Sequence, residues 1–383
     1  LLAIHTISEV IFLNSAFRVA WDNYGAQQFL NYGRLPGSLL MINWPICGND
    51  YGKGVERLIA SEASRQQFLQ EAYWHSQNFA HFIQMELGQR YGLARNIFPQ
   101  TQFPNSFALH PYYRESRRIR GQITVTEKDI LPLNGRCVAA LPLSETGEVS
   151  AIAVGNYAND HHYPGVEFSL QPKSIRWGGR WTGTPFTIPY GSLVPMTTEG
   201  LLVCEKNISV SHIANGSTRL QPVVMNIGQA AGMAAALCIE LNCQPWELAV
   251  RKVQEALLTD LFAPAAIIPL FNLPSEHPDW LSWQRYYLNH PDVYPIDGNC
   301  PCTEVTFEPE FSNYYRGIFK KYSAQDYQIT LTEPITQTGQ NWTLITLRPE
   351  VNQKLKTYAE GQLVSIWGRC NASGGWLIVE RGE

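Results

Sequence analysis

The longest regular alternation of apolar and polar positions lies between residues 61 and 91. Apolar side chains recur there every three or four residues, while Glu, Gln and Arg fall on the opposite side, so the pattern predicts one long amphipathic helix. The apolar stripe consists of Phe68, Ala72, His75, Phe79, Phe82 and Ile83. We interpret His75 as a core histidine that bonds within the protein, with a ligand role as the alternative.

A second organised stretch runs from residue 185 to residue 241. It contains a Pro- and Gly-rich approach, a short apolar strand, a polar loop with His212 and Arg219, and a helix that opens at Pro222. A helix N-terminus presents N–H groups and the positive end of the helix dipole, so this loop–helix unit favours an anion or an electron-rich ring. Small residues recur along the helix and would let a backbone or a flat ligand approach: Gly228, Ala231, Gly232 and Ala235. A second amphipathic helix is expected in residues 245–258.

Residues 103–182 carry strand-like patterns. Alternation in residues 119–125 and 150–156 predicts two strands, and Thr126 with Asp129 predicts a capped helix start between them. The later run Asp160-His161-His162 interrupts the apolar pattern. It is a surface turn, a substrate-facing loop or part of a metal site. A metal site would need further ligands that the sequence does not identify, and we predict none.

The last third of the chain divides in two. Residues 271–302 lack periodicity and are rich in Pro, Trp and Tyr, which predicts a linker held against a surface. Five short strands with one helix between the third and fourth follow, the pattern of an oligonucleotide/oligosaccharide-binding (OB) type barrel. The expected strands are residues 314–320, 327–332, 342–347, 363–368 and 376–380, and the helix is residues 351–359. Acidic side chains nearly balance the basic ones, so a structural or protein-contact role is favoured over nucleic-acid binding.

Composition narrows the class of protein. The 383 residues are 45% hydrophobic and 16% charged with a net charge of −4, which indicates a globular protein and argues against a general nucleic-acid or anionic-membrane binder. Of eight cysteines only Cys300 and Cys302 are close in sequence, at a spacing that is poor for a zinc pair or an unstrained disulfide. We interpret the cysteines as reduced in a cytoplasmic protein, and we expect no membrane span.

Common cofactor and catalytic motifs are absent from the sequence. It contains no G-x-G-x-x-G dinucleotide fingerprint, no phosphate-binding P-loop and no G-x-S-x-G, H-E-x-x-H or paired C-x-x-C motif. Five longer segments nevertheless stand together in a fixed order. They are LLMINWPICGND at residues 39–50, YYRESRRIRG with TVTEKD at 112–129, PYGSLVP at 189–195, NISVSHIANGSTR at 207–219 and GQAAGMAAAL at 228–237.

Together these segments resemble the signatures of bacterial FAD-dependent oxidoreductases of the glutathione-reductase-like superfamily. The resemblance implies an α/β (α+β) fold in which a partial, Rossmann-like FAD-binding domain is interrupted by a β-rich substrate domain and followed by the OB-like barrel. The boundaries expected are 1–104 for helical and irregular parts of the first region, 105–187 for the substrate domain, 188–270 for the returning FAD-binding segment, 271–302 for the linker and 303–383 for the barrel.

The resemblance also implies a function. The chain would be the C-terminal portion of an FAD-dependent oxidoreductase that transfers hydride between a small organic substrate and the flavin. The alternative is a non-enzymatic scaffold or binding protein on a degenerate flavoprotein fold, with the barrel as its working part. The substrate, the electron acceptor and the oligomeric state are left open by the sequence.

Site residues follow from the matched positions. His212 is expected as an acid–base group and Arg219 as a clamp for negative charge, with a hydrogen bond that braces the loop as the alternative for each. Arg117 and Arg118 bind an anionic substrate or form structural ion pairs. Residues expected to line the cofactor are Ile208, Ser209, Ser211, Gln221, Pro222, Val223 and Gly228. No metal ligand is expected.

Two departures from the family pattern stand out. The family has Gly-Arg just before the Ile-Ser segment, and this chain has Glu205-Lys206 there. The Gly-rich pyrophosphate loop of an N-terminal βαβ unit is also missing. Together with a first residue that is Leu, these departures predict either a fragment of a longer protein or a chain that has lost or altered FAD binding.

Overall fold

The structure is a computed structural model of the chain. It describes residues 17–18, 21–22, 25–26, 30–31, 33–41, 48–88, 90–94, 106–108, 111–134, 136–157, 160–161, 184–305, 313–324, 326–371 and 375–383. Within this described part the chain forms two compact units, one in residues 1–113 and the other in residues 114–161 and 184–383. The middle of the predicted segment 39–50, as well as His162, lies outside the described residues.

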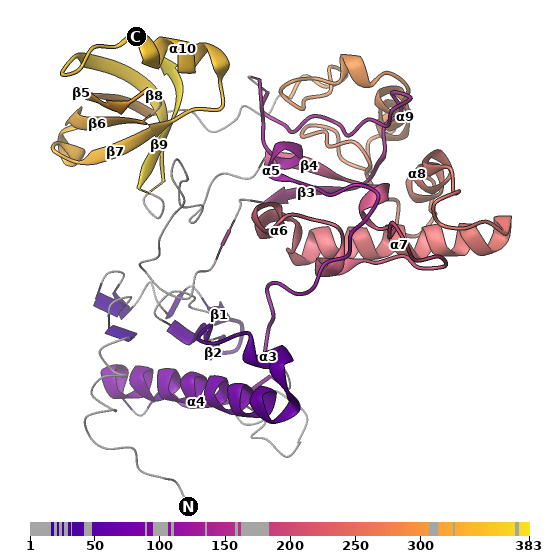
Figure 1. Ribbon diagram of the computed structural model, residues 1–383, viewed down its shortest axis with the longest axis horizontal. Helices are drawn as coiled ribbons and strands as arrows, with labels where there is room; N and C mark the ends of the chain where they lie inside the picture. The colour runs from indigo at the N-terminus through magenta and orange to yellow at the C-terminus, as the bar shows by residue number, and fades with distance from the viewer. Residues whose placement is uncertain are drawn as a thin grey trace, which may run out of the picture. The chain divides into compact units, whose positions relative to one another are not determined.

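The first unit is built on α4 (Glu62–Leu87), the long helix that the apolar stripe predicts (Figure 1). Ser61 caps it, with the hydroxyl oxygen accepting from the Ser64 N–H at 3.1 Å, and the helix stops at Gly88, which has a φ of 90°. The stripe packs against Phe17 and Trp21, which confirms the predicted helix and its buried face. The unit also contains α3 (Arg57–Ala60) and the antiparallel pair β1 (Arg34–Leu35) and β2 (Leu39–Leu40).

His75 lies on α4 as part of this packed face. Its Nε2 is 2.7 Å from the carbonyl oxygen of Gly48, and its ring contacts Phe17 and Tyr51. Burial lowers the pKa of His75, and the bond to the Gly48 carbonyl opposes that effect. The imidazole therefore bonds within the unit, as the core interpretation expects.

The second unit contains a small antiparallel pair of strands, β3 (Ala151–Tyr157) and β4 (Thr184–Pro189). The strand predicted at residues 150–156 is confirmed as β3, but the strand predicted at residues 119–125 is wrong. That segment makes only the isolated bridges Gly121–Pro195 and Val125–Val210, because its backbone bonds to two different stretches of chain instead of one partner strand. The predicted helix start is correct: α5 (Glu127–Ile130) opens with the Asp129 carboxylate accepting from the Thr126 N–H at 2.7 Å.

Helices complete the core of this unit. After the short 3₁₀ turns η2 (Tyr190–Ser192) and η3 (Glu205–Asn207) come α6 (His212–Thr218), α7 (Gln221–Leu241) and α8 (Val250–Leu258). One face of α7 packs into the core near β3 and α8 (Figure 1). That face consists of Val223, Ile227, Ala230, Ala231, Ala234 and Cys238. By length and composition alone α7 is also apolar enough to cross a membrane, although 28% of its most apolar window is buried within the protein.

Residues 271–302 contain a helix that the sequence pattern does not predict, α9 (Trp280–Asn289), followed by the turn η4 (Pro291–Val293). Trp280, Tyr287 and Leu288 belong to the core of the second unit. The side-chain amide of Gln284 accepts from the N–H groups of Ile267 and Ile268 and donates to the Ile268 carbonyl. The aromatic and Pro-rich stretch is thus bonded and packed along much of its length.

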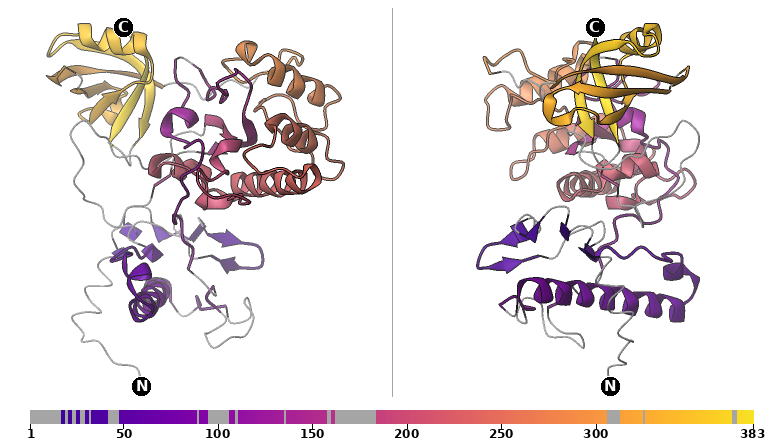
Figure 2. Two further views of the ribbon diagram at one scale, coloured as in Figure 1. Left: turned by 45° about the vertical axis from the view of Figure 1, so that its right-hand side comes forward. Right: turned by 90° about the vertical axis from the view of Figure 1, so that its left-hand side faces the viewer.

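The C-terminal region, yellow in Figure 2, forms a closed barrel. Its strand order is β5-β6-β7-β9-β8. Its elements are β5 (Asn313–Ser323), β6 (Asp326–Glu333), η5 (Ile335–Gln337), β7 (Asn341–Ile345), α10 (Pro349–Thr357), β8 (Leu363–Asn371) and β9 (Trp376–Gly382). Strands β7 and β9 are parallel and the other pairs are antiparallel. All five predicted strands and the helix are confirmed.

Two glycines permit the close strand packing of the barrel. Gly317 and Gly368 lie at irregularities of the strand register, and a Cβ at Gly368 would stand 2.0 Å from the carbonyl oxygen of Ile378. A larger residue therefore cannot occupy this bulge without a backbone shift.

Candidate functional site

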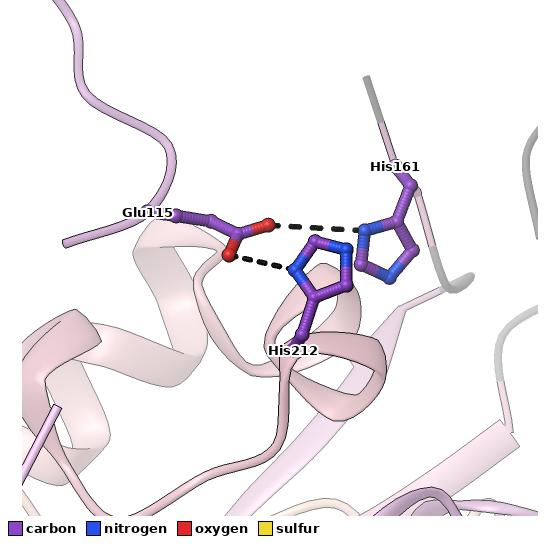
Figure 3. A group of neighbouring side chains, drawn as sticks. All are labelled: Glu115, His161 and His212. Atoms are coloured by element: carbon purple, nitrogen blue, oxygen red, sulfur yellow. Dashed lines mark hydrogen bonds and ion pairs between the residues drawn. The ribbon is translucent and has the colours of Figure 1, made fainter. Parts of the chain in front are cut away.

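Three side chains from distant parts of the sequence converge in the second unit. Glu115 comes from the irregular stretch before α5, His161 follows β3 in the sequence, and His212 is the first residue of α6 (Figure 3). Their possible ligand atoms all lie within 4.8 Å of one another. Figure 3 shows that the two carboxylate oxygens of Glu115 each face a ring nitrogen of one histidine.

The start of α6 fixes His212 in this position. The Ser211 hydroxyl oxygen accepts from the Ala214 N–H at 3.1 Å and caps the helix, while the Ser211 N–H donates to the Val125 carbonyl at 2.7 Å. The predicted polar loop is therefore wrong for residues 212–218. The run is rich in Asn, Gly, Ser and Thr, which are weak helix formers, but burial of residues 214–218 stabilises the helix in spite of that composition.

Glu115 binds His212 directly. Nδ1 of His212 lies 2.8 Å from Oε2 of Glu115, and Nη1 of Arg118 lies 3.1 Å from the same oxygen. The hydrogen bond to Glu115 raises the pKa of His212, against the smaller opposing effect of burial. Burial alone would raise the pKa of Glu115, but the contacts with His212 and Arg118 together outweigh it and lower that pKa. The pair thus favours its charged form.

His161 lies beside this pair and is buried, with a side chain that is 2% exposed. Its Nε2 is 2.9 Å from the Ile213 carbonyl oxygen, which can only accept, so Nε2 carries the hydrogen. Its Nδ1 then faces Oε1 of Glu115 at 3.9 Å, and its ring centroid is 4.7 Å from that of His212. Burial lowers the pKa of His161, with the Ile213 bond opposing. The two histidines therefore have pKa values shifted in opposite directions.

Arg219 is the C-cap of α6 and is buried, 6% exposed. Its Nη2 donates to the Asp160 carbonyl oxygen at 2.8 Å and lies 3.9 Å from the Asp160 carboxylate. These contacts hold the end of β3, and so His161, against α6. The placement favours the bracing alternative for Arg219, and its catalytic role stays a prediction.

The residues expected to line the cofactor fall into two groups. Ile208, Ser209 and Ser211 belong to a stretch that bonds backbone to backbone with Val125, and the Ser209 hydroxyl is 2.8 Å from that of Thr124. Gln221, Pro222, Val223 and Gly228 lie in the first two turns of α7. Ile208, Ser209 and Val223 are buried, whereas Gln221 and Pro222 are exposed.

Sequence reasoning assigned no role to Glu115. It stands within the quoted segment at residues 112–121, but its partner His212 is 97 positions away, and nothing local indicates the pairing. His161 was expected as a turn, substrate-loop or metal residue. Its place beside His212 depends on the β3–α6 packing, which no sequence pattern encodes.

A family model described as FAD dependent oxidoreductase matches residues 5–257. The chain belongs to this family. Membership implies FAD as the cofactor and a general flavin-dependent oxidoreductase function. No curated protein and no solved structure matches the chain.

The second unit has features that suit the cofactor of the FAD dependent oxidoreductases. The N-cap residue of α7, Leu220, makes no side-chain cap, so the positive end of the helix dipole at this N-terminus favours a negative or electron-rich group. Among the described atoms nothing lies within 4 Å of a Cβ built on Gly228 or Gly232, which leaves the helix surface smooth. The open surface at Gly228, which is among the residues expected to line the cofactor, leaves room for the edge of a flat ring.

Glu205 adopts a backbone conformation that favours glycine. Its φ of 65° lies in the left-handed region, which costs a side-chain-bearing residue about 1–2 kcal/mol. Its carboxylate pairs with Lys206 at 2.7 Å. A glycine at this position would adopt the same φ without that cost.

Glu115, His161 and His212 also offer the donor atoms of a metal site. Two contacts compete with that use: Arg118 pairs with the same carboxylate oxygen, and that oxygen accepts from His212 Nδ1. A nearby guanidinium repels a divalent cation, so the arrangement favours a hydrogen-bonded network over a metal centre.

Proposed function

We propose that this chain forms the acid–base and flavin-edge portion of an FAD-dependent oxidoreductase that transfers hydride between a small organic substrate and the flavin. One observation carries the proposal: the 2.8 Å bond between His212 Nδ1 and Glu115 Oε2. A carboxylate that holds one ring nitrogen of an accessible histidine is the usual device for presenting the other nitrogen to a substrate.

Each residue has a defined task in this proposal. Glu115 accepts from Nδ1–H, so in the neutral form of His212 the lone pair of Nε2 is available to take a proton from a substrate hydroxyl or amine, and in the charged form Nε2–H can return it. The side chain of His212 is 54% exposed, which lets a substrate reach it. His161 and Arg219 position the rings. Bound FAD supplies the acceptor or donor of the hydride.

The cofactor edge is assigned to the start of α7. We place Gln221, Pro222, Val223 and Gly228, with Ile208, Ser209 and Ser211, in the part of the chain that holds the flavin ring. The uncapped N-terminus of α7 supports this assignment, because its N–H groups stabilise negative charge. We further propose that α6 and α7 belong to a Rossmann-like FAD-binding domain, and that the protein is cytoplasmic.

Anaerobic reduction tests the proposed role of His212. A panel of alcohols, amines and 2-hydroxy acids is screened for loss of the visible flavin absorption of the wild-type protein. With a compound that reduces it, His212→Ala should react roughly 100-fold more slowly or worse while retaining FAD. The exposed His290 gives a matched control, since His290→Ala should react at the wild-type rate. An unchanged rate in His212→Ala would remove His212 from catalysis.

The barrel supports a second candidate function. Its strand order, with the helix α10 between β7 and β8 and the parallel pair β7–β9, is consistent with an OB-like module, whose second and third strands bind oligomers in other proteins. In that case the chain is a scaffold or binding protein on a degenerate flavoprotein fold. A full-length protein that binds no FAD but retains a ligand on β6 and β7 would favour this alternative.

A further inference from the structure

Two thiols outside the proposed active site lie next to each other. Sγ of Cys300 is 3.0 Å from Sγ of Cys302. The fold therefore holds the two sulfurs close enough for a disulfide to form after a small movement. Cys300 is buried, 1% exposed, whereas Cys302 is partly exposed. The intervening Pro301 restricts the backbone between them.

Asn272 holds the loop that carries both thiols. Its side-chain oxygen accepts from the Cys300 N–H at 2.6 Å, and its side-chain nitrogen lies 2.8 Å from the Cys300 carbonyl oxygen. The same nitrogen is 2.7 Å from the Thr303 hydroxyl and 2.8 Å from the Val305 carbonyl oxygen. A single buried amide therefore bonds to the backbone on both sides of Cys302. Because these bonds fix the loop, the two sulfurs lie close together in spite of a sequence spacing that is poor for an unstrained disulfide.

We propose that Cys300 and Cys302 form a redox-active dithiol that closes reversibly to a disulfide with low-molecular-weight disulfides as oxidant. The Cys302 thiolate attacks one sulfur of the oxidant, and the first small thiol leaves with a proton. Cys300 then gives up its proton and attacks the Cys302 sulfur, and the second small thiol leaves. The two protein thiols lose two electrons, which reduce the oxidant to two thiols.

The exposure of the two sulfurs sets the order of these steps. Cys302 is the accessible sulfur and makes the mixed disulfide. Burial raises the pKa of the Cys300 thiol, and Cys302 also contributes, so Cys300 is a poor first nucleophile. In the second step the closeness of Cys300 to Cys302 compensates for its raised pKa, because the attack is intramolecular and needs no diffusion of a second thiol from solution. A tight ring of this size is strained and easily reduced, which favours a reversible bond over a permanent one.

Mass spectrometry tests the pair in the full chain. The reduced protein is incubated with oxidised glutathione, the remaining thiols are alkylated with iodoacetamide, and the protein is digested. We expect the peptide with Cys300 and Cys302 to lose two hydrogens and both alkylation sites, and dithiothreitol to restore them. In Cys302→Ser the same peptide should carry no internal disulfide. Cys300 should remain a thiol, which iodoacetamide either alkylates or leaves unreacted.

Other cysteines of the chain serve as internal controls. Cys204 is exposed, and we expect it to become glutathionylated or alkylated without internal bonding. Two outcomes would overturn the proposal: full alkylation of both Cys300 and Cys302 after oxidation, or a stable glutathione adduct on Cys302 with Cys300 still reduced. Both readings come from the wild-type protein, so they hold even if a variant fails to fold.

Discussion

Nδ1 of His212 donates to Oε2 of Glu115 across 2.8 Å, although the two residues are 97 positions apart in the sequence. The bond joins the first residue of α6 to an irregular stretch that also supplies Arg118 to the same oxygen. This relationship turns an exposed histidine into an oriented one.

The pKa of His212 should depend on Glu115. The hydrogen bond to this carboxylate raises the pKa of His212 above its ordinary value, so Glu115→Gln should move it back down. The measurement is an NMR titration of the histidine ring protons in both proteins. A His212 pKa that is equal in both proteins would show that the bond does not persist in solution.

The stability contributed by this pair should have two pH limits. The raised pKa of His212 means that its contribution is fully present below the ordinary value of 6.5 and is lost as pH rises through the folded-state pKa. The lowered pKa of Glu115 means that its contribution is present above 4.5 and is lost as pH falls through its folded-state pKa.

Glu115→Gln should therefore differ most from wild type between these two values, by about 0.5 kcal/mol after allowance for solvent screening. Urea unfolding at a series of pH values measures the difference. A difference that grows steadily on the alkaline side of the His212 titration would contradict the assignment.

Glu205→Gly should stabilise the protein. The φ of 65° at Glu205 is unfavourable for a residue with a side chain, and glycine removes that cost while losing more entropy on folding. The net gain expected is about 0.5–1 kcal/mol in the free energy of unfolding, measured by urea denaturation. Glu205→Ala separates the causes, because it removes the Lys206 ion pair but keeps the strained backbone, and it should not stabilise.

Alanine substitutions at Gly228 and Gly232 should have the same effect on stability but different effects on cofactor binding. Both lie in the interior of α7 with open space at the Cβ position, so alanine at either should raise the free energy of unfolding by about 0.5–1 kcal/mol. Only Gly228 belongs to the proposed cofactor edge, so only Gly228→Ala should weaken FAD binding in a fluorescence titration. Equal FAD affinity in both variants would remove Gly228 from the cofactor edge.

Periodic sequence patterns predicted much of this fold. The stripe on α4 and the alternation in the barrel strands are local signals with one buried face each, and both were confirmed. The segment at residues 119–125 has the same alternation, but its partners are single residues of separate stretches, so no strand forms. Alternation of apolar and polar residues indicates a chain with one buried face, but it does not indicate whether a partner strand exists.

The site was predictable only in part, and for a related reason. His212 and Arg219 were found from a resemblance, but their surroundings depend on packing. The α6 helix forms from weak helix formers because Ser211 caps it and the core buries it. Glu115 and His161 reach His212 from opposite directions through contacts that span many positions. Long-range contacts of this kind carry no local sequence signal.

The visible absorption spectrum of the purified native gene product tests most directly whether this protein works with bound FAD. We expect the absorption bands of an oxidised flavin, in wild type and in His212→Ala alike, since His212 acts on the substrate and does not hold the cofactor. A colourless native protein that remains colourless after incubation with FAD would contradict this expectation.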